Sequence, residues 1–158
     1  MTAGYDVPYM LRTREYYRAQ GYDTDYQWAH NSTTPFTKFT GQIDDAKIAL
    51  VSTAMPDTEQ GRTQRQVYAT PCSPVPTSMY TSELSWDKQA THTEDVGSFL
   101  PISILRKLAE QGVVGGLTEN FYSVPTDYSQ RHTQEDDAPA ILEMCRGEGA
   151  NIALLVPL

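Results

Sequence analysis

The sequence has few cysteines, no long apolar run and no basic segment. Its two cysteines, Cys72 and Cys145, lie far apart in the chain, which favours buried, reduced thiols over a disulfide framework. No run approaches the roughly 20 apolar residues that span a bilayer. The first residues lack the basic-then-apolar pattern of a signal peptide. We therefore expect a cytoplasmic protein without a membrane partner.

Basic residues are too few for a nucleic-acid-binding protein. The chain has 12 lysines and arginines against 20 aspartates and glutamates, a net charge of −8, so no basic face is available to compensate phosphates. Its 158 residues are 39% hydrophobic and 20% charged, which is ordinary for one globular domain with a core. We expect a small-molecule substrate and no nucleic acid.

The common cofactor and metal motifs are also missing. The glycines of 112–116 follow a predicted helix instead of joining a strand to one, so they are not a dinucleotide-binding fingerprint. The sequence contains no phosphate-binding loop, no CxxC pair and no HExxH motif. His30, His92 and His132 have no metal-ligand spacing. We therefore expect no metal and no bound cofactor.

Apolar periodicity predicts an α/β fold. Helical spacing indicates helices over 8–20, 100–112 and 133–149, the first followed by a glycine and the other two ending in one. In the last helix we expect one apolar face, made by Ala138, Ile141, Leu142 and Cys145. Compact apolar runs predict strands at 48–51 and, after a turn, within 113–125. Helix, turn and strand in succession predict three layers, with a mainly parallel sheet flanked by helices in one domain over 1–158.

Residues 57–98 form a polar, loop-rich insertion in this pattern. The segment is poor in aliphatic residues and rich in Thr, Ser, Pro and Gln, with one predicted strand within 65–71. It is longer than an ordinary structureless connection. We interpret it either as a binding insertion or as a partly disordered segment.

The last eight residues, "NIALLVPL", include six apolar ones and predict a buried strand of a parallel sheet. Ligands of such sheets bind beyond the carboxyl ends of the strands, and here the sequence stops at that point. We expect a truncated sheet in the N-terminal portion of a longer protein. The alternative is a complete chain that pairs its open edge with another chain, most simply as a homo-oligomer.

Two polar segments hold the candidate site residues. In "HTED", His92 lies three residues before Asp95, and the two can form an acid–base pair if they share a helical turn. In "PTDYSQRH", Asp127, Tyr128 and Arg131 can line a pocket, with the arginine as a two-pronged clamp for a carboxylate. We predict catalytic roles for the first pair and substrate binding for the other three. The alternative is that all five are caps and surface hydrogen bonds.

Longer phrases carry a family resemblance. "VPYMLRTREYYRAQGY", "HTEDVGSFLPISILRKLAEQGVVGGL", "FYSVPTDYSQR" and "DDAPAILEMCRGEGANIALLVPL" resemble, in order, the selenoprotein B family of glycine, sarcosine, betaine and D-proline reductases, and more closely its shorter bacterial relatives. The resemblance implies an α/β oxidoreductase of amino-acid metabolism that reductively cleaves a bond in a small amino-acid-derived substrate. It also implies a selenol or thiol nucleophile and a dithiol or thioredoxin-like protein as electron donor.

In that family the strand equivalent to "IALLVPL" leads into a segment with a selenocysteine or cysteine. We therefore expect selenocysteine just after Leu158, with its UGA codon read as a stop, and we expect the 158-residue chain alone to be inactive. Two other functions stay open, because a fold does not fix a function. One is a non-catalytic binding or assembly subunit, and the other is a racemase or isomerase on a similar scaffold.

Overall fold

The structure is a computed structural model that describes residues 8–25, 27–34, 37–84 and 88–158. It divides into two compact units, residues 1–36 and residues 37–158. The first unit contains α1 (Tyr9–Ala19), which confirms the first predicted helix. The helix ends before Gly21, whose φ of +88° glycine adopts at little steric cost. No helix in the described ranges is long and apolar enough to cross a membrane.

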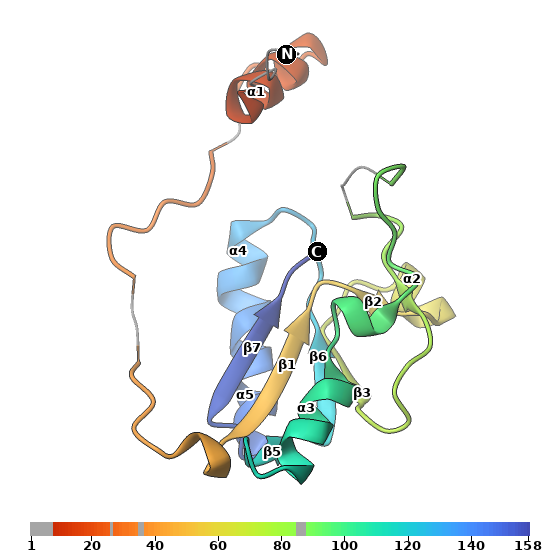
Figure 1. Cartoon of the computed structure of the whole chain (residues 1–158). Coiled ribbons are helices and arrows are strands. Elements are labelled where there is room, and N and C mark those ends of the chain that lie inside the picture. Colours follow the sequence, from red (N-terminus) through yellow and green to blue (C-terminus); the bar gives the residue numbers. More distant parts are fainter. Residues whose placement is uncertain (1–7, 26, 35–36, 85–87) are drawn as a thin grey trace, which may run out of the picture. The chain divides into compact units, whose positions relative to one another are not determined.

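The second unit is built on a sheet whose centre is β1 (Lys47–Ser52). On one side, β1 pairs along its length with β7 (Ile152–Val156). On the other side it pairs first with β5 (Gly116–Leu117) and then with β6 (Asn120–Ser123). These three partners run parallel to β1, and β3 (Tyr68–Pro71) adds an antiparallel strand outside β6 (Figure 1). The predicted α/β class and mainly parallel sheet are confirmed.

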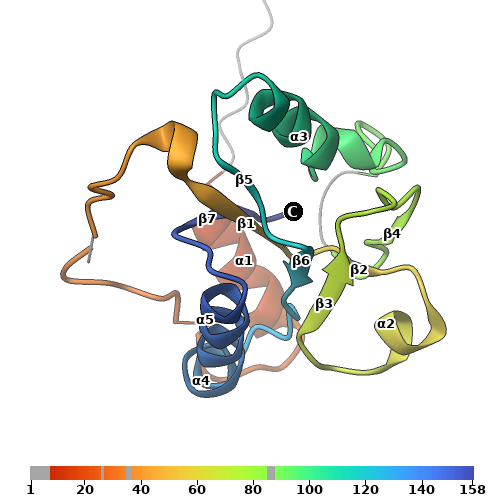
Figure 2. The ribbon, with the colours of Figure 1, turned by 90° about the horizontal axis from the view of Figure 1, so that it is seen from below.

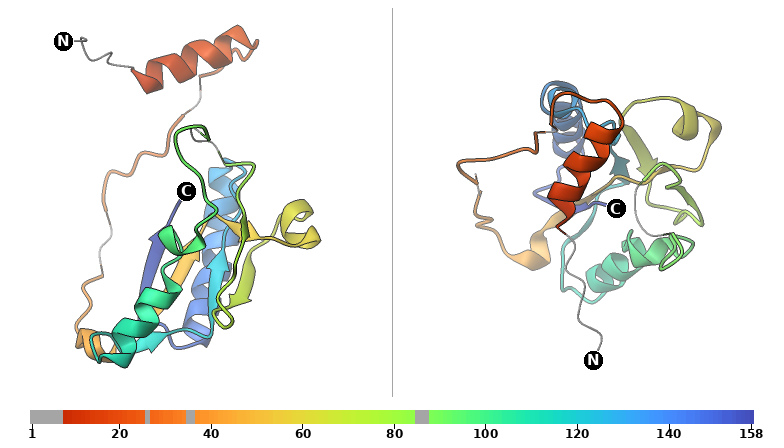
Figure 3. Two further views of the ribbon diagram at one scale, coloured as in Figure 1. Left: turned by 45° about the vertical axis from the view of Figure 1, so that its right-hand side comes forward. Right: turned by 90° about the horizontal axis from the view of Figure 1, so that it is seen from above.

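The predicted insertion, 57–98, is mostly described, with 85–87 outside the described residues. With the residues just before it, it carries short elements: β2 (Met55–Pro56), α2 (Glu59–Thr63), β3, β4 (Met79–Tyr80) and a 3-10 turn, η2 (Val96–Ser98). β2 and β4 pair as a small antiparallel sheet, and α2 projects beside the main sheet (Figure 3). Gly61 packs so closely that an added Cβ would lie 2.1 Å from the Pro56 carbonyl oxygen.

The two remaining predicted helices are confirmed, with one irregular turn. α3 spans Ile102–Glu110. The other helix begins at Gln130 and consists of α4 (Gln130–His132), a π-helical turn η3 (Thr133–Asp137) and α5 (Ala138–Gly147). Pro139 lacks an N–H and its ring crowds the carbonyl four residues earlier, which explains the wider turn before it. A second short turn, η1 (Ile43–Asp45), precedes β1.

Apolar clusters cover both faces of the sheet. Ile48 and Leu50 of β1 belong to a cluster that includes residues of α3. Ala49 and Val51 point to the opposite face, where Cys145 of α5 packs. α3 and α5 accordingly lie on opposite sides of the sheet in Figure 2. This alternation follows from the two-residue period of a strand.

Two predictions of burial are wrong. In the last helix, Cys145 is buried, but Ala138 and Leu142 are exposed, because the helix contacts the sheet through a narrower stripe that includes Met144. The terminal strand exists and is parallel to β1, as predicted, but it is not interior. β7 lies at the edge of the described sheet, and Leu155 is 68% exposed. An apolar run indicates a strand without telling how many neighbours that strand has.

Candidate functional site

The carboxyl ends of β1, β6 and β7 meet at one edge of the sheet. The Leu158 N–H, just after β7, donates to the Thr53 hydroxyl, just after β1, at 2.9 Å. The Val124 N–H, just after β6, donates to the Ser52 carbonyl at 2.9 Å. Three strand ends are thus joined at the edge where α/β sheets bind ligands.

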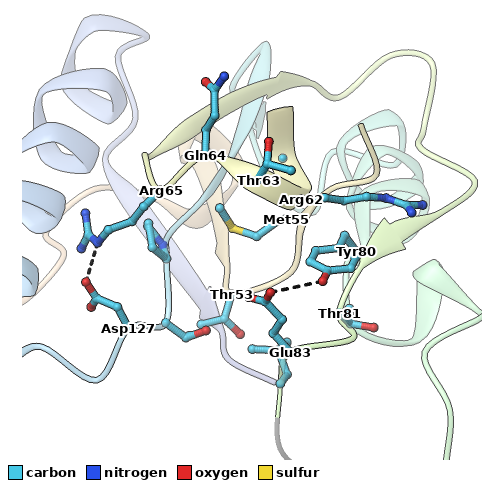
Figure 4. A pocket seen from close by; sticks show the side chains of 14 residues that line it. Thr53, Met55, Arg62, Thr63, Gln64, Arg65, Tyr80, Thr81, Glu83 and Asp127 are labelled. Carbon is cyan, nitrogen blue, oxygen red and sulfur yellow. Dashed lines mark hydrogen bonds and ion pairs between the residues drawn. The ribbon is translucent and has the colours of Figure 1, made fainter. Parts of the chain in front are cut away.

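A cavity of about 350 Å³ opens at this edge, and we call it the carboxyl-edge cavity (Figure 4). Thr53 lines it from β1, and Pro125, Thr126 and Asp127 line it from the segment after β6. Most of the remaining lining comes from the insertion, including Arg62, Arg65, Tyr80 and Glu83. The insertion therefore forms most of the wall of this cavity.

Arg65 holds two carboxylates at the wall of the cavity. Its Nη1 and Nη2 donate to the two oxygens of Asp137 at 3.2 and 2.7 Å, and its Nε donates to Asp127. The Asp137 side chain is 3% exposed and that of Arg65 is 36% exposed. Such two-pronged pairing fixes both partners. The hydrogen bond from Arg65, followed by that from His132, holds the pKa of Asp127 far below its usual range.

His132 completes this network through both of its ring nitrogens. Its Nε2 lies 2.9 Å from Nη2 of Arg131. Its Nδ1 lies 2.7 Å from an oxygen of Asp127. Asp127 and His132 therefore have the geometry of an acid–base dyad.

The other two predicted binding residues lie outside the lining of the cavity. Tyr128 is 71% exposed and has a φ of +56°. The Arg131 side chain is 65% exposed and pairs with Glu135 at 3.3 Å, one helical turn away. Of the three predicted residues in this segment, the structure brings only Asp127 to the cavity.

His92 and Asp95 do not form the predicted pair on one helical turn. Asp95 caps η2 by accepting a hydrogen bond from the Gly97 N–H at 3.0 Å, so its carboxylate serves the turn that follows. His92 precedes that turn outside any helix or strand, and its Nδ1 accepts from the Glu94 N–H at 3.4 Å. His92 nevertheless lines a cavity of about 340 Å³ together with Phe99 and Leu158, which we call the His92 cavity. The His92 cavity therefore lies at the end of β7.

The sequence prediction missed the charged residues of the insertion. Arg62 and Arg65 are the only basic residues between positions 48 and 87, and their three-residue spacing was the available signal. The carboxylates that Arg65 binds lie 62 and 72 residues further along the chain, a distance over which residue spacing carries no information.

A third cavity, of about 650 Å³, includes Cys72, Arg106 and Glu110 in its lining, and we call it the Cys72 cavity. Both cysteines are free and buried, as predicted. Burial raises the pKa of Cys72 to about 11 although Arg106 opposes the shift, so this thiol is a poor nucleophile at neutral pH. Within the described residues, no three His, Cys, Asp or Glu side chains are grouped to hold a metal ion.

No family model, curated protein or solved structure matches the chain. Function is therefore inferred below from the geometry of the carboxyl edge and from the resemblance of the sequence.

Proposed function

We propose that the protein is an oxidoreductase of the glycine, sarcosine, betaine and D-proline reductase selenoprotein B type. It would reductively cleave a bond in a small amino-acid-derived substrate. The ordered resemblance along the sequence supports this proposal, and the α/β class agrees with it. In that family a selenol or thiol nucleophile follows the strand that corresponds to β7. The two electrons would come from a dithiol, which leaves as a disulfide.

The position of the end of β7 is the observation that carries the proposal. Leu158 lines the His92 cavity, and its N–H binds the hydroxyl of Thr53, which lines the carboxyl-edge cavity. A nucleophile attached after β7 would thus enter beside His92 and Thr53. A selenol is largely ionised near neutral pH and needs no dedicated base there, whereas a thiol would need a cation or a helix N-terminus to lower its pKa.

The site residues take the following roles in this proposal. His92 transfers protons at the end of β7, and Asp95 holds the turn that follows it by capping η2. Asp127 binds the substrate in the carboxyl-edge cavity. Tyr128 and Arg131 lie outside the lining of that cavity, so no substrate contact is assigned to them there. These roles follow from the chemistry of the side chains and from their places at or near the carboxyl edge.

We further propose a cytoplasmic location, a thioredoxin-like or other dithiol electron donor, and a homo-oligomeric state. The last of these has a specific support in β7. Its leucines Leu154 and Leu155 are 40% and 68% exposed at the edge of the described sheet, and an uncharged edge strand invites association. The same observation favours a second candidate function, that of a non-catalytic assembly subunit.

The test uses the product extended past Leu158 by its own gene, with cysteine in place of any selenocysteine. The extended protein is incubated with dithiothreitol and, in turn, glycine, sarcosine, betaine and D-proline. We expect substrate-dependent formation of oxidised dithiothreitol. His92→Gln should lower the turnover by roughly 10²- to 10⁴-fold if His92 is a general acid or base. The matched control is His30→Gln, because His30 lines none of the three cavities.

Two results would contradict the proposal. Isomerisation of a substrate without consumption of dithiol would indicate a racemase or isomerase. A folded extended protein that consumes neither substrate nor dithiol, but assembles with a partner, would indicate the assembly subunit.

A further inference from the structure

The carboxyl-edge cavity and the His92 cavity are joined by two hydrogen bonds. The hydroxyls of Thr81 and Thr93 lie 2.7 Å apart, and the Leu158 N–H donates to the Thr53 hydroxyl at 2.9 Å. Thr53 and Thr81 line the carboxyl-edge cavity, whereas Thr93 and Leu158 line the His92 cavity. Each hydrogen bond thus has one partner in each lining, so the two cavities are neighbours at the carboxyl edge of the sheet.

We call Thr53, Thr81, Thr93 and Leu158 the shared wall. Figure 4 shows Thr53 and Thr81 on the side of the carboxyl-edge cavity that lies opposite Gln64. At hydrogen-bond distance, no second layer of side chains fits between the paired atoms. The shared wall presents hydroxyl and amide groups and contains no charged side chain. A ligand that extends along it therefore meets hydrogen-bonding groups and no opposing side-chain charge.

The linings of the two cavities differ in charge. The carboxyl-edge cavity is lined by side chains of both signs, those of Arg62, Arg65, Glu83 and Asp127. The described lining of the His92 cavity has no lysine, arginine, aspartate or glutamate, and it includes the buried Phe99. The cavities measure about 350 and 340 Å³. Each is small for a ligand site, and together they lie well inside the usual range of roughly 300 to 1,000 Å³.

We propose that the two cavities are compartments of one binding site, whose ligand has a dipolar head in the carboxyl-edge cavity and an uncharged tail in the His92 cavity. A lining with charges of both signs is complementary to a head that carries both signs. The spanning of both cavities rests on the shared wall and on the difference in charge, whereas the identity of the head as an amino acid rests on the function proposed above. The preferred ligand is therefore larger than glycine.

The experiment titrates the 158-residue chain with three probes and follows its backbone amide shifts by NMR. Glycine is the head alone, norleucine adds an uncharged four-carbon tail, and butan-1-ol is a tail without the head. The two enantiomers of norleucine are titrated separately. We expect glycine to shift the amides of Gln64 and Asp127, and one enantiomer of norleucine to shift those of Ser98 and Phe99 as well.

The dissociation constants distinguish one spanning ligand from two separate sites. If one norleucine molecule spans the wall, the amides of both cavities follow the same Kd. Because the tail removes apolar surface from water, norleucine should bind about tenfold more tightly than glycine, in the millimolar range that so small a ligand allows. Butan-1-ol should bind more weakly than norleucine.

Two leucines at the end of the chain provide a matched pair of variants. Leu154 and Leu158 are 40% and 39% exposed, but only Leu158 lines a cavity. Leu158→Ala should weaken norleucine binding by roughly three- to tenfold through lost apolar contact, and should leave glycine binding unchanged. Leu154→Ala should change neither. The amide spectra report whether each variant has kept its fold.

The inference is overturned if neither enantiomer of norleucine shifts the amides of both cavities, or if the two sets follow different Kd values. Equal binding of butan-1-ol and norleucine, or an unchanged affinity of Leu158→Ala for norleucine, would also overturn it. Its failure is distinguishable from that of the proposed function, because no dithiol is present. Norleucine binding across the wall supports the inference even if the extended protein oxidises no dithiol. Conversely, an extended protein that reduces glycine but binds norleucine in one cavity only would refute the inference and leave the reductase in place.

Discussion

Strands β1 and β7 have almost the same sequence and very different surroundings. β1 contains Ile-Ala-Leu-Val and β7 contains Ile-Ala-Leu-Leu-Val, and the two pair in register, with Leu50 opposite Leu154. Leu50 is 0% exposed, whereas Leu154 is 40% exposed. Among the described strands, β1 has neighbours on both sides and β7 on one. The comparison shows that burial here follows the position in the sheet and not the local sequence.

The exposed position of β7 also bears on the function of this strand. An apolar strand at an open edge leaves unpaired backbone groups and exposed leucines, a surface that proteins ordinarily cover or charge. Beyond the last paired residues, Ser52 and Val156, the chain after β7 is joined to the chain after β1 by the hydrogen bond from Leu158 to Thr53. The segment after β6, by contrast, enters the ion-pair network of Arg65. These differences predict unequal effects of equivalent substitutions.

The largest effect should come from truncating the buried member of the leucine pair. Leu50→Ala removes side-chain volume from a fully buried position and should lower the free energy of unfolding by about 3 kcal/mol. Leu154→Ala, the same change on the paired residue, should cost less than about 1 kcal/mol, because much of this side chain is already in water. Urea unfolding of both variants measures the difference. Equal losses would show that β7 is as buried as β1.

A smaller loss is expected at the ion-pair network. Arg65→Ala leaves the Asp137 carboxylate buried without its partner, and should cost about 2 kcal/mol, discounted because the arginine is partly exposed. Thr53→Val keeps the shape and removes the hydroxyl that accepts from Leu158, and should cost less than about 1 kcal/mol. Thermal or urea unfolding compares the two variants. A larger loss for Thr53→Val would mean that the end of β7, and not the network, holds this edge together.

The ion-pair network of Arg65 should also make the stability of the protein depend on pH in the acidic range. Because Arg65 and His132 lower the pKa of Asp127 in the folded state, its contribution to stability is present above the unfolded pKa of about 4 and is lost as the pH falls below it. Asp127→Asn should remove this part of the acid dependence, by less than about 1 kcal/mol for a carboxylate that is partly in water. Urea unfolding of the wild type and of Asp127→Asn between pH 2 and pH 6 measures this difference. Identical pH dependence of the two proteins would contradict the pairing.

The smallest effect on the chain is expected at the outer leucine of β7. Leu155 is 68% exposed, so Leu155→Lys should change the free energy of unfolding by less than about 0.5 kcal/mol. The same change should reduce self-association if the edge is an interface, because a lysine protects an edge strand. Sedimentation velocity of both proteins tests this. A strong loss of stability in the monomer would show that the strand is already covered.

Sequence patterns predicted most of the fold because they report local and periodic features. The helix near Ile102 and Leu105 has a clear apolar period and the strand near Leu50 is a compact apolar run, and both are confirmed. The exposure of β7 was not predictable, because the number of strand neighbours is a long-range property. Of the carboxyl-edge cavity, the sequence predicted only Asp127, since the partners of Asp127 come from the insertion and from α4.

The Asp127–His132 dyad illustrates the same limit at short range. The five-residue spacing does not match a helical turn, and the contact arises because the chain bends before α4. The Ser129 N–H donates to Asp127 at 3.2 Å, and the Ser129 hydroxyl accepts from the His132 N–H at 3.2 Å. By contrast, the three-residue spacing of His92 and Asp95 suggested a pair that the cap of η2 prevents.

The nucleotide sequence that follows codon 158 tests most directly whether the end of β7 presents a redox-active selenium or sulfur atom. The account predicts a UGA codon with a decoding hairpin, or a cysteine codon, followed by a continuing reading frame. A UAA or UAG codon directly after Leu158, or a UGA codon without a hairpin and without an in-frame continuation, would contradict it.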